Sequence, residues 1–145
     1  MLELHPLVDE GRIGTVGFSY GGTLALFLAA WDNRVRAAVV SGYFSSWRAA
    51  HRVPGNMCGS QVLPGMLGEL EHLDVGALIA PRALLIETGI EDPIFPRDAA
   101  EAAVADLRRV YSAMHAPSDA LEHDVFAGGH RWHGEDVGPF LSRWL

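Results

Sequence analysis

One stretch near the N-terminus decides the fold of this chain: residues 12–31 read RIGTVGFSYGGTLALFLAAW. Residues 12–18 form a short and mostly apolar segment, which is typical of a buried strand. Residues 23–31 are apolar nearly all round, which is typical of a helix packed between a sheet and another layer. Between them stand Ser19, Tyr20 and two glycines. The stretch therefore predicts a strand, a tight turn and a buried helix.

The alternation of strands and helices continues towards the C-terminus. Mostly apolar segments at residues 35–42, 82–89 and 121–126 predict three further buried strands. The segment 96–114 predicts the clearest helix, because its apolar residues recur at spacings of three and four, and residues 132–145 predict the last helix. Strands that alternate with helices indicate an α/β fold, here a mostly parallel sheet of about four strands flanked by helices.

Length and composition agree with one packed domain. The chain has 145 residues, 49% of them hydrophobic, and its Gly and Pro residues are scattered, so we expect a single domain spanning residues 1–145. The longest connection, residues 45–80, is rich in Gly, Pro, Met and Trp, and a short helix is expected near residues 67–73. Connections of this length are often binding loops or lids.

Charge and cysteine content argue against several classes of function. Eleven Lys and Arg residues against eighteen Asp and Glu residues give a net charge of −7, which repels phosphate backbones and anionic membrane surfaces. Neither nucleic acid nor a membrane is therefore expected as a partner. The chain has a single cysteine, Cys58, and its first residues do not resemble a signal sequence, so a cytoplasmic protein without a cofactor is expected.

The turn at Ser19 has the spacing Gly-x-Ser-x-Gly, from Gly17 to Gly21. A nucleophile at the tip of a strained turn between a strand and a helix needs small residues two positions before and after it, so that the backbone can fold sharply. In such a turn the Ser19 hydroxyl projects from the carboxyl end of the sheet, and the backbone N–H of Tyr20 can point at a developing oxyanion. The motif and its setting favour a nucleophilic serine over a structural one.

Acid and base candidates follow two later strands. Asp92 or its neighbour Glu91 comes after the third predicted strand, and Asp92 is favoured because prolines stiffen the loop just beyond it. His130 comes after the fourth predicted strand, and the two glycines before it let the loop bend towards Ser19. Ser19, Asp92 and His130 therefore stand in the chain order nucleophile, acid, base that is described for α/β-hydrolases.

Two other groups of residues are less specific. Trp47, Met57 and Met66 lie in the long connection and line either an acyl or sugar pocket or a small satellite core. Histidines and acidic residues stand close together near the C-terminus, but their spacing is not that of a His-Glu-x-x-His zinc site. No metal is therefore expected.

Five stretches of the chain resemble a known family. They are VDEGRIG (8–14), GFSYGG (17–22), LIAPRALLI (78–86), GIEDPIFP (89–96) and GGHRWHG (128–134). Over essentially its whole length the chain resembles the C-terminal half of a serine α/β-hydrolase, close to the dienelactone-hydrolase-like and acetyl-xylan-esterase-like members. The resemblance implies that Ser19 is the nucleophile, Asp92 the acid and His130 the base, and that the Tyr20 N–H is one oxyanion donor. Dienelactone hydrolases proper have a cysteine nucleophile where this chain has Ser19, which favours ordinary ester hydrolysis.

The resemblance also implies an activity. We expect a carboxylic ester hydrolase that forms an acyl-enzyme from a small-molecule ester, with acetyl esters of carbohydrates as one substrate class. A peptidase or acyltransferase using the same three residues is an alternative, and so is a catalytically weak or inactive interaction module. In the family resembled, several strands and a loop with the second oxyanion donor precede the serine turn, and we expect them to be lacking here. The first strand would then expose a sheet edge that can pair in a homodimer.

Overall fold

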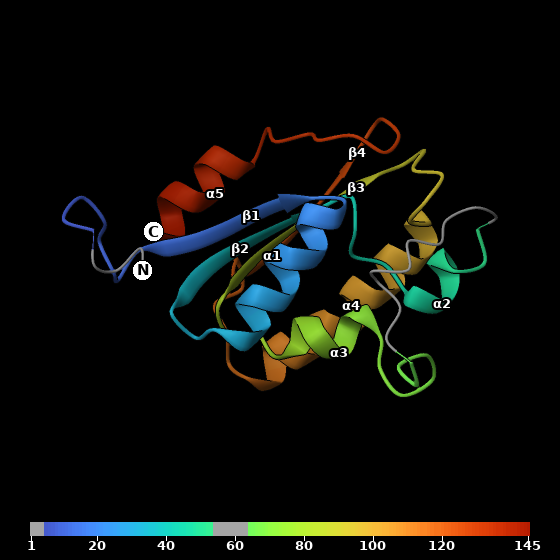
Figure 1. Ribbon diagram of the computed structural model, residues 1–145, viewed down its shortest axis with the longest axis horizontal. Helices are drawn as coiled ribbons and strands as arrows, with labels where there is room; N and C mark the ends of the chain where they lie inside the picture. The colour runs from blue at the N-terminus through green and yellow to red at the C-terminus, as the bar shows by residue number, and fades with distance from the viewer. Residues whose placement is uncertain (1–4, 54–63) are drawn as a thin grey trace.

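The computed structural model of the protein describes residues 5–53 and 64–145. Its strands form one parallel sheet in the order β1-β2-β3-β4, with β1 at Ile13–Phe18, β2 at Val35–Ser41, β3 at Ala83–Gly89 and β4 at Leu121–Phe126. The spatial order equals the order in the sequence, so each connection moves the chain one strand along the sheet (Figure 1). The predicted parallel sheet of about four strands is confirmed.

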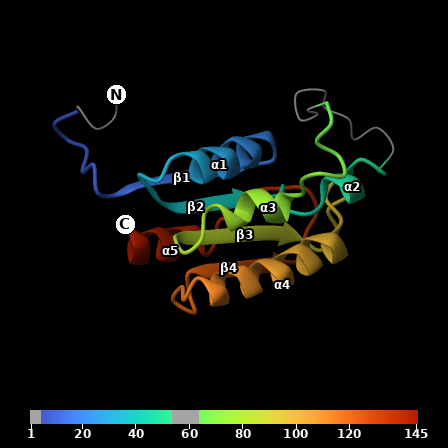
Figure 2. The ribbon, with the colours of Figure 1, turned by 90° about the horizontal axis from the view of Figure 1, so that it is seen from below.

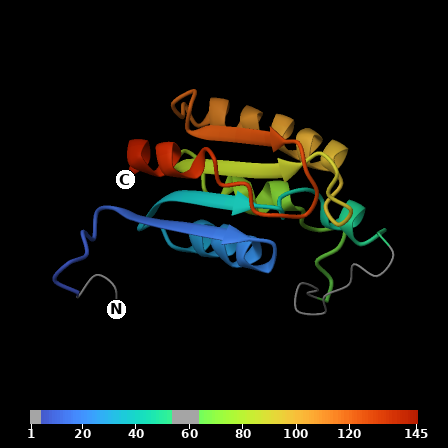
Figure 3. The same ribbon diagram turned by 90° about the horizontal axis from the view of Figure 1, so that it is seen from above.

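Helices cover both faces of this sheet. Figures 2 and 3 show α1 (Tyr20–Trp31), α3 (His72–Ala77) and α4 (Arg97–Ala113) on one face and α5 (Val137–Trp144) on the other. The short α2 (Trp47–Ala50) lies beside the carboxyl ends of the strands. The α/β arrangement leaves this carboxyl end open to the loops that follow the strands, which is where ligands bind in such sheets.

Two of the predicted helices begin elsewhere. The helix expected at residues 67–73 corresponds to α3, which begins at His72. It does not begin at residue 67 because Gly68 has a φ of 102°, a value that does not occur in a helix. The Asp74 carboxylate in the first turn of α3 accepts the Glu71 N–H and caps the helix there. The last helix begins at Val137 rather than at residue 132, because Gly134, with a φ of 78°, belongs to an irregular loop. Both errors concern glycines whose conformation the apolar pattern does not show.

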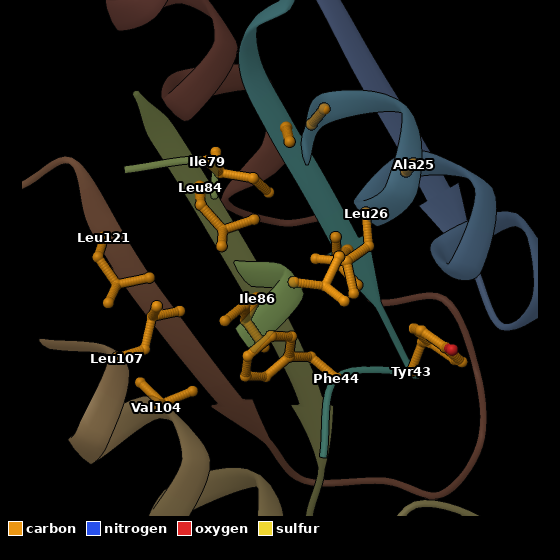
Figure 4. Packing of buried hydrophobic residues seen from close by; sticks show 14 of the residues in the cluster. Ala25, Leu26, Tyr43, Phe44, Ile79, Leu84, Ile86, Val104, Leu107 and Leu121 are labelled. Atoms are coloured by element: carbon orange, nitrogen blue, oxygen red, sulfur yellow. The ribbon is translucent and has the colours of Figure 1, made fainter. Parts of the chain in front are cut away.

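The main core lies between the sheet and the layer of α1, α3 and α4. Leu84 and Ile86 of β3 and Leu107 of α4 are fully buried there, next to Phe44 (Figure 4). A smaller core under α5 contains Val39 and other residues from the opposite face of the strands. The central strands are apolar on both faces because both faces are covered by helices.

The sheet edge at β1 and the outer side of α1 are exposed. Helix α1 buries Ala25, Leu26 and Ala29, but Leu28 is 48% exposed and Trp31 is 90% exposed. The prediction of a buried α1 is therefore correct for one side only, since no described element covers the other. In the described part of the chain no helix has the length and hydropathy needed to cross a membrane. Pairing of the β1 edge in a homodimer stays a prediction.

Candidate active site

Ser19 lies at the tip of the turn between β1 and α1. Its φ is 54° and its ψ is −119°, a backbone conformation that residues with a side chain rarely adopt. The Ser19 N–H donates to the carbonyl of Ser41 at 2.9 Å, and the Ser19 carbonyl accepts the N–H of Thr23 at 3.1 Å. Bonds to β2 and to the first turn of α1 thus hold the residue in a strained conformation, as is common at functional sites.

The glycines around Ser19 differ in how tightly they are packed. A Cβ atom at Gly17 would overlap the carbonyl group of Gly21, and one at Gly22 would lie 2.9 Å from the Cβ of Tyr43. At Gly21 no described atom lies within 4 Å of the Cβ position. Position 17 therefore has no room for a side chain, but the second tight position is Gly22 and not Gly21, because the first turn of α1 directs the Cβ position of Gly21 into open space.

Asp92 is held in the loop after β3 by hydrogen bonds to both of its carboxylate oxygens. Oδ1 accepts the N–H groups of Ile94 at 2.8 Å and Phe95 at 3.0 Å, and Oδ2 lies 2.8 Å from His130 Nδ1. Burial alone raises the pKa of Asp92, but the bonds from His130 and from the two backbone N–H groups outweigh it, and the pKa lies below its ordinary value of 3.8. Glu91 is exposed, so Asp92 is the carboxylate that meets the histidine.

His130 joins Ser19 to Asp92. Its Nε2 lies 2.8 Å from Ser19 Oγ, and its Nδ1 lies 2.8 Å from Asp92 Oδ2. An ionised carboxylate only accepts hydrogen bonds, so the network assigns the imidazole proton to Nδ1 and leaves Nε2 to accept from the Ser19 hydroxyl. The rings of Phe18 and Phe95 flank the imidazole at centroid distances of 4.8 and 5.8 Å. The structure thus brings the three candidates of the sequence into one hydrogen-bonded series.

A close approach of two backbone segments places His130 over the sheet. The loop after β4 crosses the carboxyl ends of the strands (Figure 3), and the Gly128 carbonyl accepts the Glu91 N–H at 2.8 Å. A Cβ atom at Gly89, the last residue of β3, would lie 2.7 Å from that same carbonyl oxygen. The sequence indicated the glycines before His130 but gave no reason to single out Gly89, since its partner lies about forty residues later in the chain.

Tyr20 is the first residue of α1. Its backbone N–H therefore has no carbonyl one turn earlier in the helix to bond, and the positive end of the helix dipole lies beside Ser19. This is the position from which the sequence predicted an oxyanion donor. A backbone N–H there can stabilise negative charge that develops next to Ser19 Oγ.

The candidate pocket residues of the long connection lie elsewhere. Trp47 is 2% exposed and Met66 is 6% exposed, and both belong to the core, where Trp47 Nε1 donates to the Tyr43 hydroxyl at 3.1 Å. For these two residues the structure supports the core interpretation, because both are buried members of the main core. Met57 lies outside the described residues. A cavity of about 580 Å³ lies between α1 and α3 near Trp31, at the opposite end of α1 from Ser19.

Among residues 5–53 and 64–145, no three His, Cys, Asp or Glu side chains are arranged to hold a metal ion. His133, one of the histidines near the C-terminus, stacks on the ring of Phe126 at a centroid distance of 4.3 Å, and its Nε2 lies 3.6 Å from Asp124 Oδ2. These contacts attach the loop after β4 to its own strand.

By sequence the chain is similar to one peptidase family and to one relative that is named as a hydrolase. The family profile of X-Pro dipeptidyl-peptidase (S15 family) matches residues 5–124. YtaP of Bacillus subtilis (strain 168), which is named as a hydrolase, is 27% identical over 150 residues, or 95% of this chain and 48% of YtaP. The chain thus spans about half the length of this relative.

Solved structures share the fold. A CE15 glucuronoyl esterase from Caldicellulosiruptor kristjansonii is 22% identical with a TM-score of 0.77, and the match covers 94% of this chain and 43% of the esterase. The methylesterase BT1017 is 23% identical with a TM-score of 0.76, over 99% of this chain and 32% of that protein. The fold expected from the resemblance, that of a serine α/β-hydrolase, is confirmed, while the narrower likeness to dienelactone-hydrolase-like members stays a prediction. Because the family profile extends over most of its length, the chain belongs to the X-Pro dipeptidyl-peptidase (S15) family.

Proposed function

We propose that this chain carries the nucleophile, base and acid of a serine hydrolase that cleaves small carboxylic esters. The observation that carries the proposal is the unbroken hydrogen-bonded series from Ser19 Oγ through His130 to Asp92, with 2.8 Å at each step. It lies at the carboxyl end of a parallel sheet, next to the amino end of α1. Nucleophile, base and orienting acid in that geometry are the parts that acyl transfer requires.

The geometry suggests the following steps. Ser19 Oγ attacks the ester carbonyl carbon while His130 Nε2 takes the hydroxyl proton, and Asp92 stabilises the imidazolium that forms. His130 returns the proton to the leaving alcohol, and an acyl-serine remains. A water molecule, deprotonated by His130 Nε2, then attacks the acyl carbon, and His130 gives that proton to Ser19 Oγ as the acyl–oxygen bond breaks and the acid leaves. The Tyr20 N–H stabilises the oxyanion in both halves of the reaction.

The number of oxyanion donors affects the expected rate. The Tyr20 N–H is one donor, and in the family resembled a second donor comes from a loop that precedes the serine turn. Loss of one donor lowers kcat by about 10²- to 10³-fold. A site that has the Tyr20 N–H as its one donor should therefore hydrolyse esters slowly and still form a detectable acyl-enzyme.

Ester hydrolysis is preferred to peptide hydrolysis because two structures of the same fold are named as esterases, a glucuronoyl esterase and a methylesterase. The peptidase alternative has its own support, since the family is named for X-Pro dipeptidyl-peptidases. The same three residues serve both reactions, and the substrate is decided by the pocket around them. A small ester is also less demanding, because an alkoxide can leave without prior protonation, whereas an amide nitrogen must be protonated before it can leave.

Two chromogenic substrates test the proposal. With p-nitrophenyl acetate we expect a burst of p-nitrophenol followed by slow turnover, and both are lost in Ser19→Ala. Ser112→Ala is the matched control, because Ser112 is exposed on α4 and should leave the burst unchanged. An unchanged burst in Ser19→Ala refutes the assignment. A higher kcat/KM for an X-Pro p-nitroanilide than for the acetate ester supports the peptidase instead.

A further inference from the structure

Glu87 is a buried carboxylate that the steps above do not use. It lies near the carboxyl end of β3, none of its surface is exposed, and no other Asp or Glu among the described residues is as completely buried. Its register partners are Ser41 on β2 and Asp124 on β4. Removing a carboxylate from water is unfavourable unless its oxygens find hydrogen-bond donors. Oε2 of Glu87 is buried without a hydrogen-bond partner in the described part of the chain, so the donor to Oε1 is informative.

That donor belongs to the loop that carries His130. Glu87 Oε1 accepts the backbone N–H of Gly134 at 2.8 Å. Gly134 follows His130 by four residues and has a φ of 78°, so its backbone does not repeat a helix or strand and has no regular ladder to fix it. The Glu87 side chain thus bonds the backbone of the loop beyond His130 directly to the central part of the sheet.

The main chain of Glu87 acts on the other side of His130. Its carbonyl accepts the N–H of Gly42 at 2.9 Å. Gly42 closely approaches the imidazole, since a Cβ atom there would lie 3.5 Å from His130 Cε1 and 2.8 Å from the ring of Phe18. One residue therefore holds both the backbone under the imidazole and the loop beyond it.

We infer that Glu87 is a positioning residue for His130, whose carboxylate holds the loop of residues 128–135 so that the imidazole reaches Ser19 and Asp92 together. Both imidazole bonds are short, and both depend on where this loop lies. The loop has other attachments, at Gly128 and at the ring of His133, but both precede Gly134 in the chain, so the Glu87 bond holds the loop beyond them. The inference rests on the proposed function only for its effect on turnover, because the position of His130 can be observed without a substrate.

Three substitutions separate this role from simple packing. Glu87→Met fills a similar volume without an acceptor for the Gly134 N–H, whereas Glu87→Gln keeps an acceptor oxygen and removes the charge. Glu122→Met is the matched control, because Glu122 is a carboxylate on the neighbouring strand that bonds Arg143 and does not touch the loop. Thermal unfolding of each variant shows whether the fold is kept.

The primary measurement is the ¹⁵N and ¹H NMR signal of the His130 imidazole in the free protein, assigned by its loss in His130→Gln. In wild type, Glu87→Gln and Glu122→Met we expect a slowly exchanging Nδ1–H bonded to Asp92. In Glu87→Met we expect this signal to be lost. We also expect kcat for p-nitrophenyl acetate to fall by about 10²-fold, because misplacing a catalytic group by an ångström has an effect of that size. KM should be unchanged. A folded Glu87→Met that keeps the wild-type signal and kcat overturns the inference, as does a Glu87→Gln that loses both.

Two outcomes remain distinct from these. If Glu87→Met does not fold, Glu87→Asp takes its place. The shorter side chain keeps the negative charge but moves the acceptor oxygen away from the Gly134 N–H. Retention of the His130 signal in Glu87→Asp then overturns the inference. If wild type does not hydrolyse esters but the NMR signals change as expected, the proposed function fails and the positioning role of Glu87 stands.

Discussion

Alanine substitutions at Gly17, Gly21 and Gly22, the three glycines around Ser19, should differ in their effect on stability, although the Gly-x-Ser-x-Gly motif gives Gly17 and Gly21 the same role. We predict that Gly17→Ala is the most destabilising, that Gly22→Ala is intermediate, and that Gly21→Ala is neutral or stabilising. The reason is the space at each Cβ position. It is occupied by the Gly21 carbonyl group at position 17 and by Tyr43 at 2.9 Å at position 22, and it is open among the described residues at position 21.

The magnitudes follow from what must move. At Gly17 the obstacle is backbone that cannot rotate away, so α1 must shift relative to β1, and overpacking of this kind costs about 1–3 kcal/mol or more. At Gly22 the overlap is smaller, with the Cβ of Tyr43 at 2.9 Å and the carbonyl oxygen of Ser41 at 3.1 Å, and we expect a cost of about 1–2 kcal/mol, in the lower part of the same range. At Gly21, a helical position, alanine is favoured over glycine by about 0.5–1 kcal/mol.

Urea unfolding of the wild type and the three variants measures these differences as changes in midpoint at constant slope. Covalent labelling of Ser19 by a fluorophosphonate adds a readout of the site, because Gly17→Ala moves Ser19 itself while Gly21→Ala leaves it in place. We expect labelling of Gly17→Ala to slow by about 10²-fold, the effect of an ångström of misplacement. Equal midpoints for Gly17→Ala and Gly21→Ala would refute the steric account of the turn.

Two further predictions concern stability and association. His72 is fully buried, and burial lowers its pKa from 6.5 to about 3, so the unfolded chain binds more protons between these values. Stability should fall by up to about 1.4 kcal/mol per pH unit as the pH drops through this window, and an unchanged slope in His72→Asn contradicts this origin. By sedimentation we expect the chain to form a homodimer through the β1 edge and the exposed side of α1, and Leu24→Lys with Leu28→Lys to be monomeric; a monomeric wild type contradicts this.

The residues of the site could be predicted because their signals are local. Ser19, Asp92 and His130 each directly follow a strand, and each has glycine or proline close by in the sequence. A parallel sheet brings the carboxyl ends of its strands to one edge, so three separate local signals predict one cluster. The choice of Asp92 over Glu91 was likewise local, because it rested on the prolines that follow.

The parts that could not be predicted depend on contacts distant in sequence. In the sequence, Glu87 is one acidic residue within a mostly apolar strand. Its role depends on its hydrogen bond to Gly134, which lies 47 residues later in the chain. The tight position at Gly22 depends on Tyr43, and Trp47 is buried beside the rings of Phe27 and His72, which are also far from it in the sequence. Neither composition nor spacing encodes which side of a helix meets such a partner.

In helix α1 the apolar pattern of the sequence and the burial in the structure disagree. Its sequence is apolar nearly all round, which is typical of a helix covered on both sides, yet the structure covers only the side that contains Leu26. The opposite side exposes Leu24, Leu28 and Trp31, spaced by four and three residues on one helical face, and Trp31 also lines the cavity between α1 and α3. A face of this size and spacing is costly in water and favours a covering surface. The association experiment therefore tests the apolar pattern of α1 together with the unpaired edge of β1.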